Sequence, residues 1–176
     1  MSRSNWLILA LAVLASVIGG YVQHRVQQPA ASGSELIGQP AADLALPDLA
    51  GQLHHLADYR GRRVLLNFWA SWCAPCLQEM PALNRAQAKF GEHGPIVVGI
   101  AMDDAARVRS FLAAHPLDYQ VLLGDLHAPS TSLVLGNTRD VLPYSVLLDS
   151  DGSILASHTG PLPPDELERW LSGSVR

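Results

Sequence analysis

Cysteine is scarce in this sequence of 176 residues, which contains only two, and both lie in one short segment. A secreted scaffold stapled by disulfides needs several pairs, and a structural zinc site needs four cysteine or histidine ligands. Positive charge is scarce as well, with 12 Lys and Arg residues against 16 Asp and Glu and a net charge of −4. Binding to nucleic acid requires clustered basic residues, so the composition argues against nucleic acid as a partner.

One long apolar run is present, because residues 6–21 read WLILALAVLASVIGGY. A run of about 16–18 apolar residues is at the lower limit for a membrane-spanning helix. Arg3 precedes it, which favours an amino terminus in the cytoplasm and the remainder outside. No good small-x-small cleavage site follows, so we expect an uncleaved signal anchor over residues 1–22. Cleavage, which would release the chain into the periplasm, is the alternative.

A polar segment follows the apolar run. Residues 23–35 contain Pro29 and Gly33 and are expected to form a flexible tether. The remainder, residues 36–176, is long enough for one domain with a well-buried core.

Predicted strands and helices alternate within this domain. Residues 64–69 and 96–101 are continuous apolar runs and therefore predict buried strands. Asp103 and Asp104 stand at the start of a predicted helix over residues 104–115, where negative charge suits the helix dipole, although Asp103 could instead border a site. The other expected elements are a hairpin over residues 43–56, a helix over 73–90, a strand over 119–123, a hairpin over 143–157 and a helix over 165–171. This order predicts an α/β fold with a central mixed sheet flanked by helices and preceded by a hairpin extension.

The two cysteines form the motif Cys73-Ala74-Pro75-Cys76, where a predicted buried strand ends and a helix begins. The amino end of a helix presents unpaired N–H groups and a partial positive charge, which lower the pKa of a thiol placed there. Cys73 is therefore expected to attack a partner, and Cys76, one helical turn later, to resolve the mixed disulfide. Pro75 fits because the first helical turn does not use its missing N–H.

A Cys-x-x-Cys motif also occurs at haem attachment and metal sites. Haem attachment requires histidine directly after the second cysteine, and this sequence has Leu77 there. None of the seven histidines pairs locally with the motif, and His54 and His55 are expected to be exposed. We therefore expect redox chemistry with no metal and no cofactor other than a Cys73–Cys76 disulfide. A copper-binding module that uses the two sulfurs as soft ligands is the alternative from another class, and a peroxidase would need more than this thiol pair.

Residues 64–83, VLLNFWASWCAPCLQEMPAL, closely resemble the thioredoxin superfamily. The likeness is greatest to its TlpA/ResA/CcmG-like branch of membrane-tethered, extracytoplasmic thiol–disulfide reductases. The segment FWASWCAPC matches the active-site signature, and Pro81 matches a proline that kinks the helix. Leu142-Pro143, just before a predicted strand, matches the loop whose cis-proline faces the cysteines. The resemblance extends over nearly everything from Leu36 onward.

This resemblance implies a thioredoxin fold and assigns roles around the cysteines. Trp72 and Pro75 are expected to shape the surface on which a partner docks. A cis bond before Pro143 lets its ring lie against the sulfurs, because proline has no N–H, while the backbone of Leu142 pairs with an extended substrate segment.

Position 67 departs from thioredoxins proper, which carry a buried aspartate there, whereas Asn67 cannot titrate. Glu79, three residues after Cys76, matches the Cys-x-x-Cys-x-x-Glu pattern of the ResA-like branch. Residues three apart on a helix are neighbours, so a partly buried carboxylate at this position can exchange a proton with the resolving thiol. A glutamate that faces solvent is the alternative.

The resemblance also implies a cellular setting. It suggests a protein-disulfide reductase held in the bacterial inner membrane by its N-terminal helix, with the catalytic domain in the periplasm. Electrons would come from a membrane donor of the DsbD/CcdA type and pass to oxidised client proteins, for example in cytochrome c maturation. An oxidase or isomerase that introduces disulfides is the alternative among enzymes, since Ala74-Pro75 does not determine the redox potential.

Overall fold

The structure is a computed structural model that describes residues 12–19, 32–91, 94–127 and 129–173. The chain divides into two compact units, Met1–Ala30 and Ala31–Arg176. In the first unit residues 12–19 form a helix. Among the described residues, none of the helices combines the length and the apolar character needed to cross a membrane. The rest of the predicted anchor over residues 1–22, and the predicted tether as far as residue 31, lie outside the described residues.

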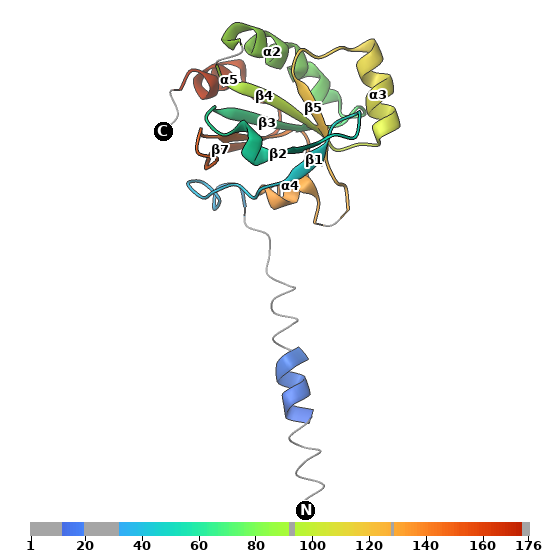
Figure 1. Cartoon of the computed structure of the whole chain (residues 1–176), viewed down its shortest axis with the longest axis vertical. Coiled ribbons are helices and arrows are strands. Elements are labelled where there is room, and N and C mark those ends of the chain that lie inside the picture. Colours follow the sequence, from blue (N-terminus) through green and yellow to red (C-terminus); the bar gives the residue numbers. More distant parts are fainter. Residues whose placement is uncertain (1–11, 20–31, 92–93, 128, 174–176) are drawn as a thin grey trace, which may run out of the picture. The chain divides into compact units, whose positions relative to one another are not determined.

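A five-stranded mixed sheet forms the centre of the second unit, with the strand order β5-β4-β3-β6-β7 (Figure 1). Strand β3 pairs in parallel with β4 and antiparallel with β6. The strands are β3 (Val64–Trp69), β4 (Ile96–Ala101), β5 (Gln120–Leu123), β6 (Tyr144–Leu148) and β7 (Ile154–Thr159). Strands β3 and β4 coincide with the two apolar runs of the sequence, because both faces of these strands are covered. The predicted mixed sheet is confirmed.

Helices cover one face of the sheet, and a hairpin with a short helix covers the other (Figure 1). The first layer contains α2 (Ala74–Phe90), α3 (Ala105–Ala114) and α5 (Pro164–Leu171). The second contains β1 (Ala45–Pro47), β2 (Leu53–His55), the 3₁₀ helix η1 (Leu56–Tyr59) and α4 (Thr131–Val134). Side chains of β3 alternate between these layers. Leu65 packs in the core under α2 and α5, whereas Leu66 and Phe68 pack in the core under the hairpin.

Helices α2 and α3 begin at residues whose side chains accept backbone N–H groups of the first turn. Cys73 is the N-cap of α2, and Pro75 lies in the first turn. Asp104 is the N-cap of α3, and its carboxylate accepts two N–H groups at 2.8 and 3.3 Å. These caps satisfy donors that have no partner inside the helix, which explains why both helices start where the sequence predicts.

The folded unit begins earlier than the predicted boundary at Leu36. Residues 33–38 form a turn, and the N–H of Gly33 donates to the carbonyl oxygen of Gly136 at 3.0 Å. A Cβ atom on Gly33 would collide with the hydroxyl group of Tyr144. The small polar residues that suggest a tether therefore allow close backbone contact at residues 32–35.

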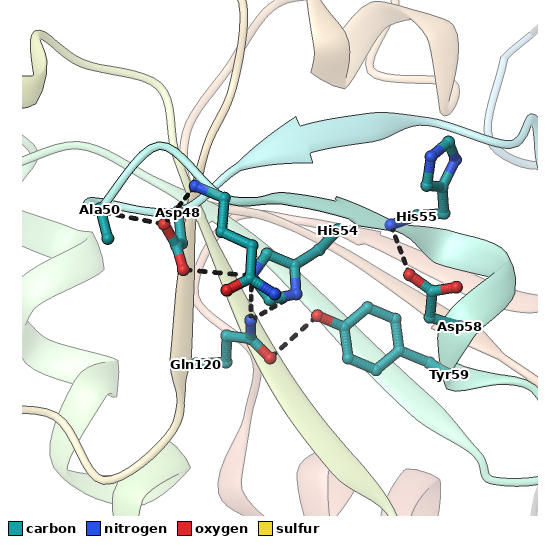
Figure 2. A network of polar contacts seen from close by, with 8 residues as sticks. Asp48, Ala50, His54, His55, Asp58, Tyr59 and Gln120 are labelled. Carbon is teal, nitrogen blue, oxygen red and sulfur yellow. Dashed lines mark hydrogen bonds and ion pairs between the residues drawn. The ribbon is translucent and has the colours of Figure 1, made fainter.

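His54 is half-buried, which corrects the expectation that it is exposed. Its Nε2 lies 3.1 Å from Oδ2 of Asp48, and its Nδ1 lies 3.2 Å from Nε2 of Gln120 on β5 (Figure 2). The hydroxyl group of Tyr59 donates to Oε1 of Gln120 at 2.9 Å. Asp48 also forms a β-bridge with Leu122. These contacts attach the hairpin to β5, an edge strand of the main sheet that otherwise presents unpaired backbone groups.

Candidate active site

Cys73 and Cys76 form a disulfide at the amino end of α2, directly after β3. Both residues are buried, with 4% of Cys73 and 0% of Cys76 exposed. The N–H of Cys76 donates to Sγ of Cys73 at 3.3 Å. In the reduced protein, this N–H and the partial positive charge of the helix end would stabilise a thiolate on Cys73. The arrangement can accept and donate a pair of electrons, and it suits Cys73 as the attacking sulfur.

Exposed residues surround the buried cysteines in the sequence. Trp72 is 66% exposed, and Pro75 is exposed as well. Trp69, by contrast, is fully buried in the core. A large exposed aromatic residue beside a disulfide offers contact area to a partner protein.

The peptide bond between Leu142 and Pro143 is cis, as the resemblance implies. Tyr144, the next residue, pairs with Phe68 on β3, so Pro143 lies at the end of the sheet where β3 leads into the redox motif. Leu142 packs against the cluster of buried residues that contains both cysteines. The structure thus brings the predicted proline loop to the disulfide.

Glu79 is buried one helical turn after Cys76, with 7% of the residue exposed. Its Oε1 accepts a hydrogen bond from Nδ2 of Asn67 at 2.7 Å, and its Oε2 accepts the N–H of Leu162 at 2.8 Å. Burial raises the pKa of Glu79, although these two bonds and the charge of His158 act in the opposite direction. The alternative of a solvent-facing glutamate is therefore wrong. A raised pKa brings this carboxyl closer to the pH range in which thiols exchange protons.

Asn67 has a role that the sequence analysis missed. It is fully buried, and its Nδ2 donates to Ser145 on β6 at 3.1 Å as well as to Glu79. Both Asn67 and Ser145 are single polar residues within otherwise apolar strands. Buried polar groups are nearly always hydrogen-bonded, so this pattern was the signal that could have indicated a partner.

Asp103 holds the loop that carries the attacking cysteine, and Asp104, not Asp103, is the helix cap. Oδ2 of Asp103 accepts hydrogen bonds from the N–H and the hydroxyl group of Ser71 at 3.0 and 2.5 Å. Oδ1 of Asp103 accepts the N–H of Asp104 at 2.8 Å. Burial acts to raise the pKa of Asp103, but these hydrogen bonds and the charge of Arg107 outweigh it and lower the pKa. Because Ser71 lies two residues before Cys73, this carboxylate positions the redox loop.

Known proteins resemble this chain in both sequence and structure. The model of the AhpC/TSA family matches residues 37–157. The thiol-disulfide oxidoreductase ResA from Bacillus cereus (strain ATCC 10987 / NRS 248) is 28% identical over 172 residues, which cover 96% of each protein. The thioredoxin-like protein YneN from Bacillus subtilis (strain 168) is 33% identical over 137 residues, covering 76% of this chain and 78% of YneN. A crystal structure described as a thiol:disulfide interchange protein DsbE from Chlorobium tepidum is 35% identical, with a TM-score of 0.69, and the match covers 78% of this chain and 96% of that one.

Proposed function

This chain belongs to the AhpC/TSA family of thioredoxin-like proteins and is a thiol–disulfide oxidoreductase, and we propose that it reduces disulfides of client proteins through Cys73 and Cys76. The observation that carries the proposal is the disulfide at the amino end of α2, with Cys73 as the N-cap. The amino end of a helix gives a sulfur access to N–H groups that have no partner inside the helix.

Reduction of a client proceeds in two exchange steps. The thiolate of Cys73 attacks one sulfur of the client disulfide, a bond forms between the two sulfurs, and the other client sulfur leaves as a thiolate. Cys76 then loses its proton and attacks Sγ of Cys73. The bond between Cys73 and Cys76 forms, and the second client sulfur leaves. The client gains two electrons, and the two cysteines of the protein lose them.

Glu79 accepts the proton that Cys76 loses in the second step. Support comes from its place one turn after Cys76, its burial and its raised pKa. If Glu79→Gln leaves the pH dependence of Cys76 reactivity unchanged, this role is overturned. The client chain docks on Trp72 and Pro75 and pairs with the backbone of Leu142 next to Pro143, which has no N–H to offer.

We place this reaction outside the cytoplasm. The apolar residues 6–21 support an N-terminal membrane anchor, and the acidic domain follows them. In this setting a membrane donor of the DsbD/CcdA type reduces the Cys73–Cys76 disulfide, which is itself the only redox group required. Oxidised apocytochromes or their partners are the proposed clients, in cytochrome c maturation.

Equilibration with glutathione redox buffers tests the direction of electron flow. A reductase requires a potential well below the value of about −120 mV that is typical of the strong oxidant DsbA. We expect the Cys73–Cys76 couple to lie well below this value and the reduced protein to reduce insulin. A potential near −120 mV would overturn the proposal in favour of an oxidase, and tight Cu(I) binding without insulin reduction would overturn it in favour of a copper-binding module.

A further inference from the structure

A row of polar residues crosses the sheet beneath helices α2 and α5. Asn67 on β3 pairs with Ser145 on β6, and Ser145 pairs with His158 on β7. Residues directly opposite each other on antiparallel strands place their side chains on the same face of the sheet. Because Asn67 donates to Glu79 on α2, the face in question is the one that these helices cover. Ser145 and His158 therefore lie on the same face as Glu79.

His158 stands at the end of this row, where the site meets the protein surface. Its side chain is 27% exposed, and its Nδ1 lies 3.4 Å from Oε2 of Glu166 on α5. Oε2 of Glu79 accepts the N–H of Leu162, which lies in the segment that connects β7 to α5. The elements that enclose Glu79 on this side are thus the elements that carry His158 and Glu166.

We propose that His158 is a positioning residue of the redox site, whose positive charge holds the carboxylate of Glu79 in the ionised form that can take the proton of Cys76. This inference rests on the proposed proton transfer from Cys76 to Glu79. The residue acts through Glu79 and does not touch the reacting sulfurs.

The hydrogen bonds of the row favour an electrostatic role over a proton relay. Asn67 donates through Nδ2 to both Glu79 and Ser145, and an amide that donates in both directions does not pass a proton along. A charge, by contrast, acts through the protein interior, where screening is weaker than in water. When it is protonated, His158 supplies a positive charge that favours ionisation of Glu79.

Three other ionisable groups lie near Glu79 or near His158. Cys76 lies on α2 itself, Glu166 on α5 faces His158, and Tyr119 directly precedes β5. Burial raises the pKa of Tyr119, so this side chain is neutral throughout the working range.

The variant His158→Gln removes the charge and tests the proposal. The reduced full-length protein is mixed with 5,5′-dithiobis(2-nitrobenzoate), and the release of the second thionitrobenzoate reports attack by Cys76 on the mixed disulfide. In a plot of this rate against pH, the rate rises with pH along a rising limb. We expect this limb to lie about half to one pH unit higher in His158→Gln than in wild type. At a fixed pH below the wild-type midpoint, this shift is a loss of about three- to tenfold in rate.

Two further variants separate charge from structure. His158→Lys keeps a positive charge at an edge strand that tolerates lysine, and we expect it to restore the wild-type limb. His55→Gln is the matched control, because His55 on β2 also lies near a carboxylate, at 3.5 Å from Asp43, but belongs to the hairpin on the other face of the sheet. We expect no shift in this control. If the rising limb of His158→Lys is displaced as far as that of His158→Gln, the role of charge is overturned.

The variant Glu79→Gln distinguishes failure of this inference from failure of the proposed function. An unshifted limb in His158→Gln, together with a changed limb in Glu79→Gln, would overturn the role of His158 alone. An unchanged limb in Glu79→Gln would overturn the proton transfer to Glu79 and the inference with it. In the double variant His158→Gln/Glu79→Gln we expect the profile of Glu79→Gln with no additional shift, and an additional shift would contradict a role through Glu79.

Discussion

Replacing Asp103 by alanine should destabilise the loop that carries Cys73. The side chain of Asp103 is 3% exposed and accepts three hydrogen bonds, two from Ser71 and one from the N–H of Asp104. A hydrogen bond to a charged group contributes about 1.5–3 kcal/mol, and less where water replaces the lost partner. Ser71 is half-buried, so water can reach its donors in the variant. We therefore expect Asp103→Ala to lower the free energy of unfolding by about 2–3 kcal/mol.

This loss of stability should depend on pH in a defined direction. The pKa of Asp103 lies below its ordinary value of 3.8 in the folded protein. The stabilisation by this carboxylate is therefore fully present above the unfolded pKa and is lost as the pH falls through the folded pKa. The difference between wild type and Asp103→Ala should stay constant from about pH 7 to pH 5 and shrink at more acidic pH.

Urea unfolding followed by tryptophan fluorescence, at neutral pH and in acid, measures both effects. Ser71→Ala is the matched control, because it removes one of the three bonds and should lower the free energy of unfolding by about 1 kcal/mol. A loss below about 0.5 kcal/mol in Asp103→Ala, or a loss that persists undiminished in acid, would show that the carboxylate of Asp103 does not stabilise this loop.

Two further predictions concern the buried residues of the site and the core. Folding raises the pKa of Glu79, so its contribution to stability is present below the unfolded pKa and is lost as the pH rises through the folded pKa. Glu79→Gln should therefore be more stable than wild type at neutral pH, by about 1.4 kcal/mol for each unit of pKa difference, and urea curves that show it less stable there would contradict this sign. Leu66→Ala removes a fully buried side chain of β3 and should lower the free energy of unfolding by about 2–5 kcal/mol. Leu53→Ala, at a position that is 60% exposed on β2, should change it by less than about 0.5 kcal/mol, and equal effects of the two leucine variants would contradict the core assignment.

The central sheet could be predicted from the sequence because its strands carry a local signal. Strands β3 and β4 are covered on both faces and read as uninterrupted apolar runs. The short helices η1 and α4 have four residues each, too few to show a helical period, and they were missed. The start of the folded unit was also missed, because Gly33 serves equally well in a tether and in close backbone contact.

The redox pair could be predicted for the same reason, since Cys73 and Cys76 form a local pattern with Pro75. The contacts that support this pair join residues far apart in sequence. Asn67 and Glu79 are 12 residues apart, and Ser71 and Asp103 are 32 residues apart. No periodicity or motif relates such positions, because tertiary packing alone brings them together.

Capture of a mixed disulfide tests most directly the claim that Cys73 attacks and Cys76 resolves. The reduced variants Cys76→Ser and Cys73→Ser are each incubated with insulin, and the products are separated without reductant and identified by mass spectrometry. We expect Cys76→Ser to accumulate an adduct in which Cys73 is bound to an insulin cysteine, whereas Cys73→Ser should form none. An adduct through Cys76 in Cys73→Ser, with none in Cys76→Ser, would contradict it.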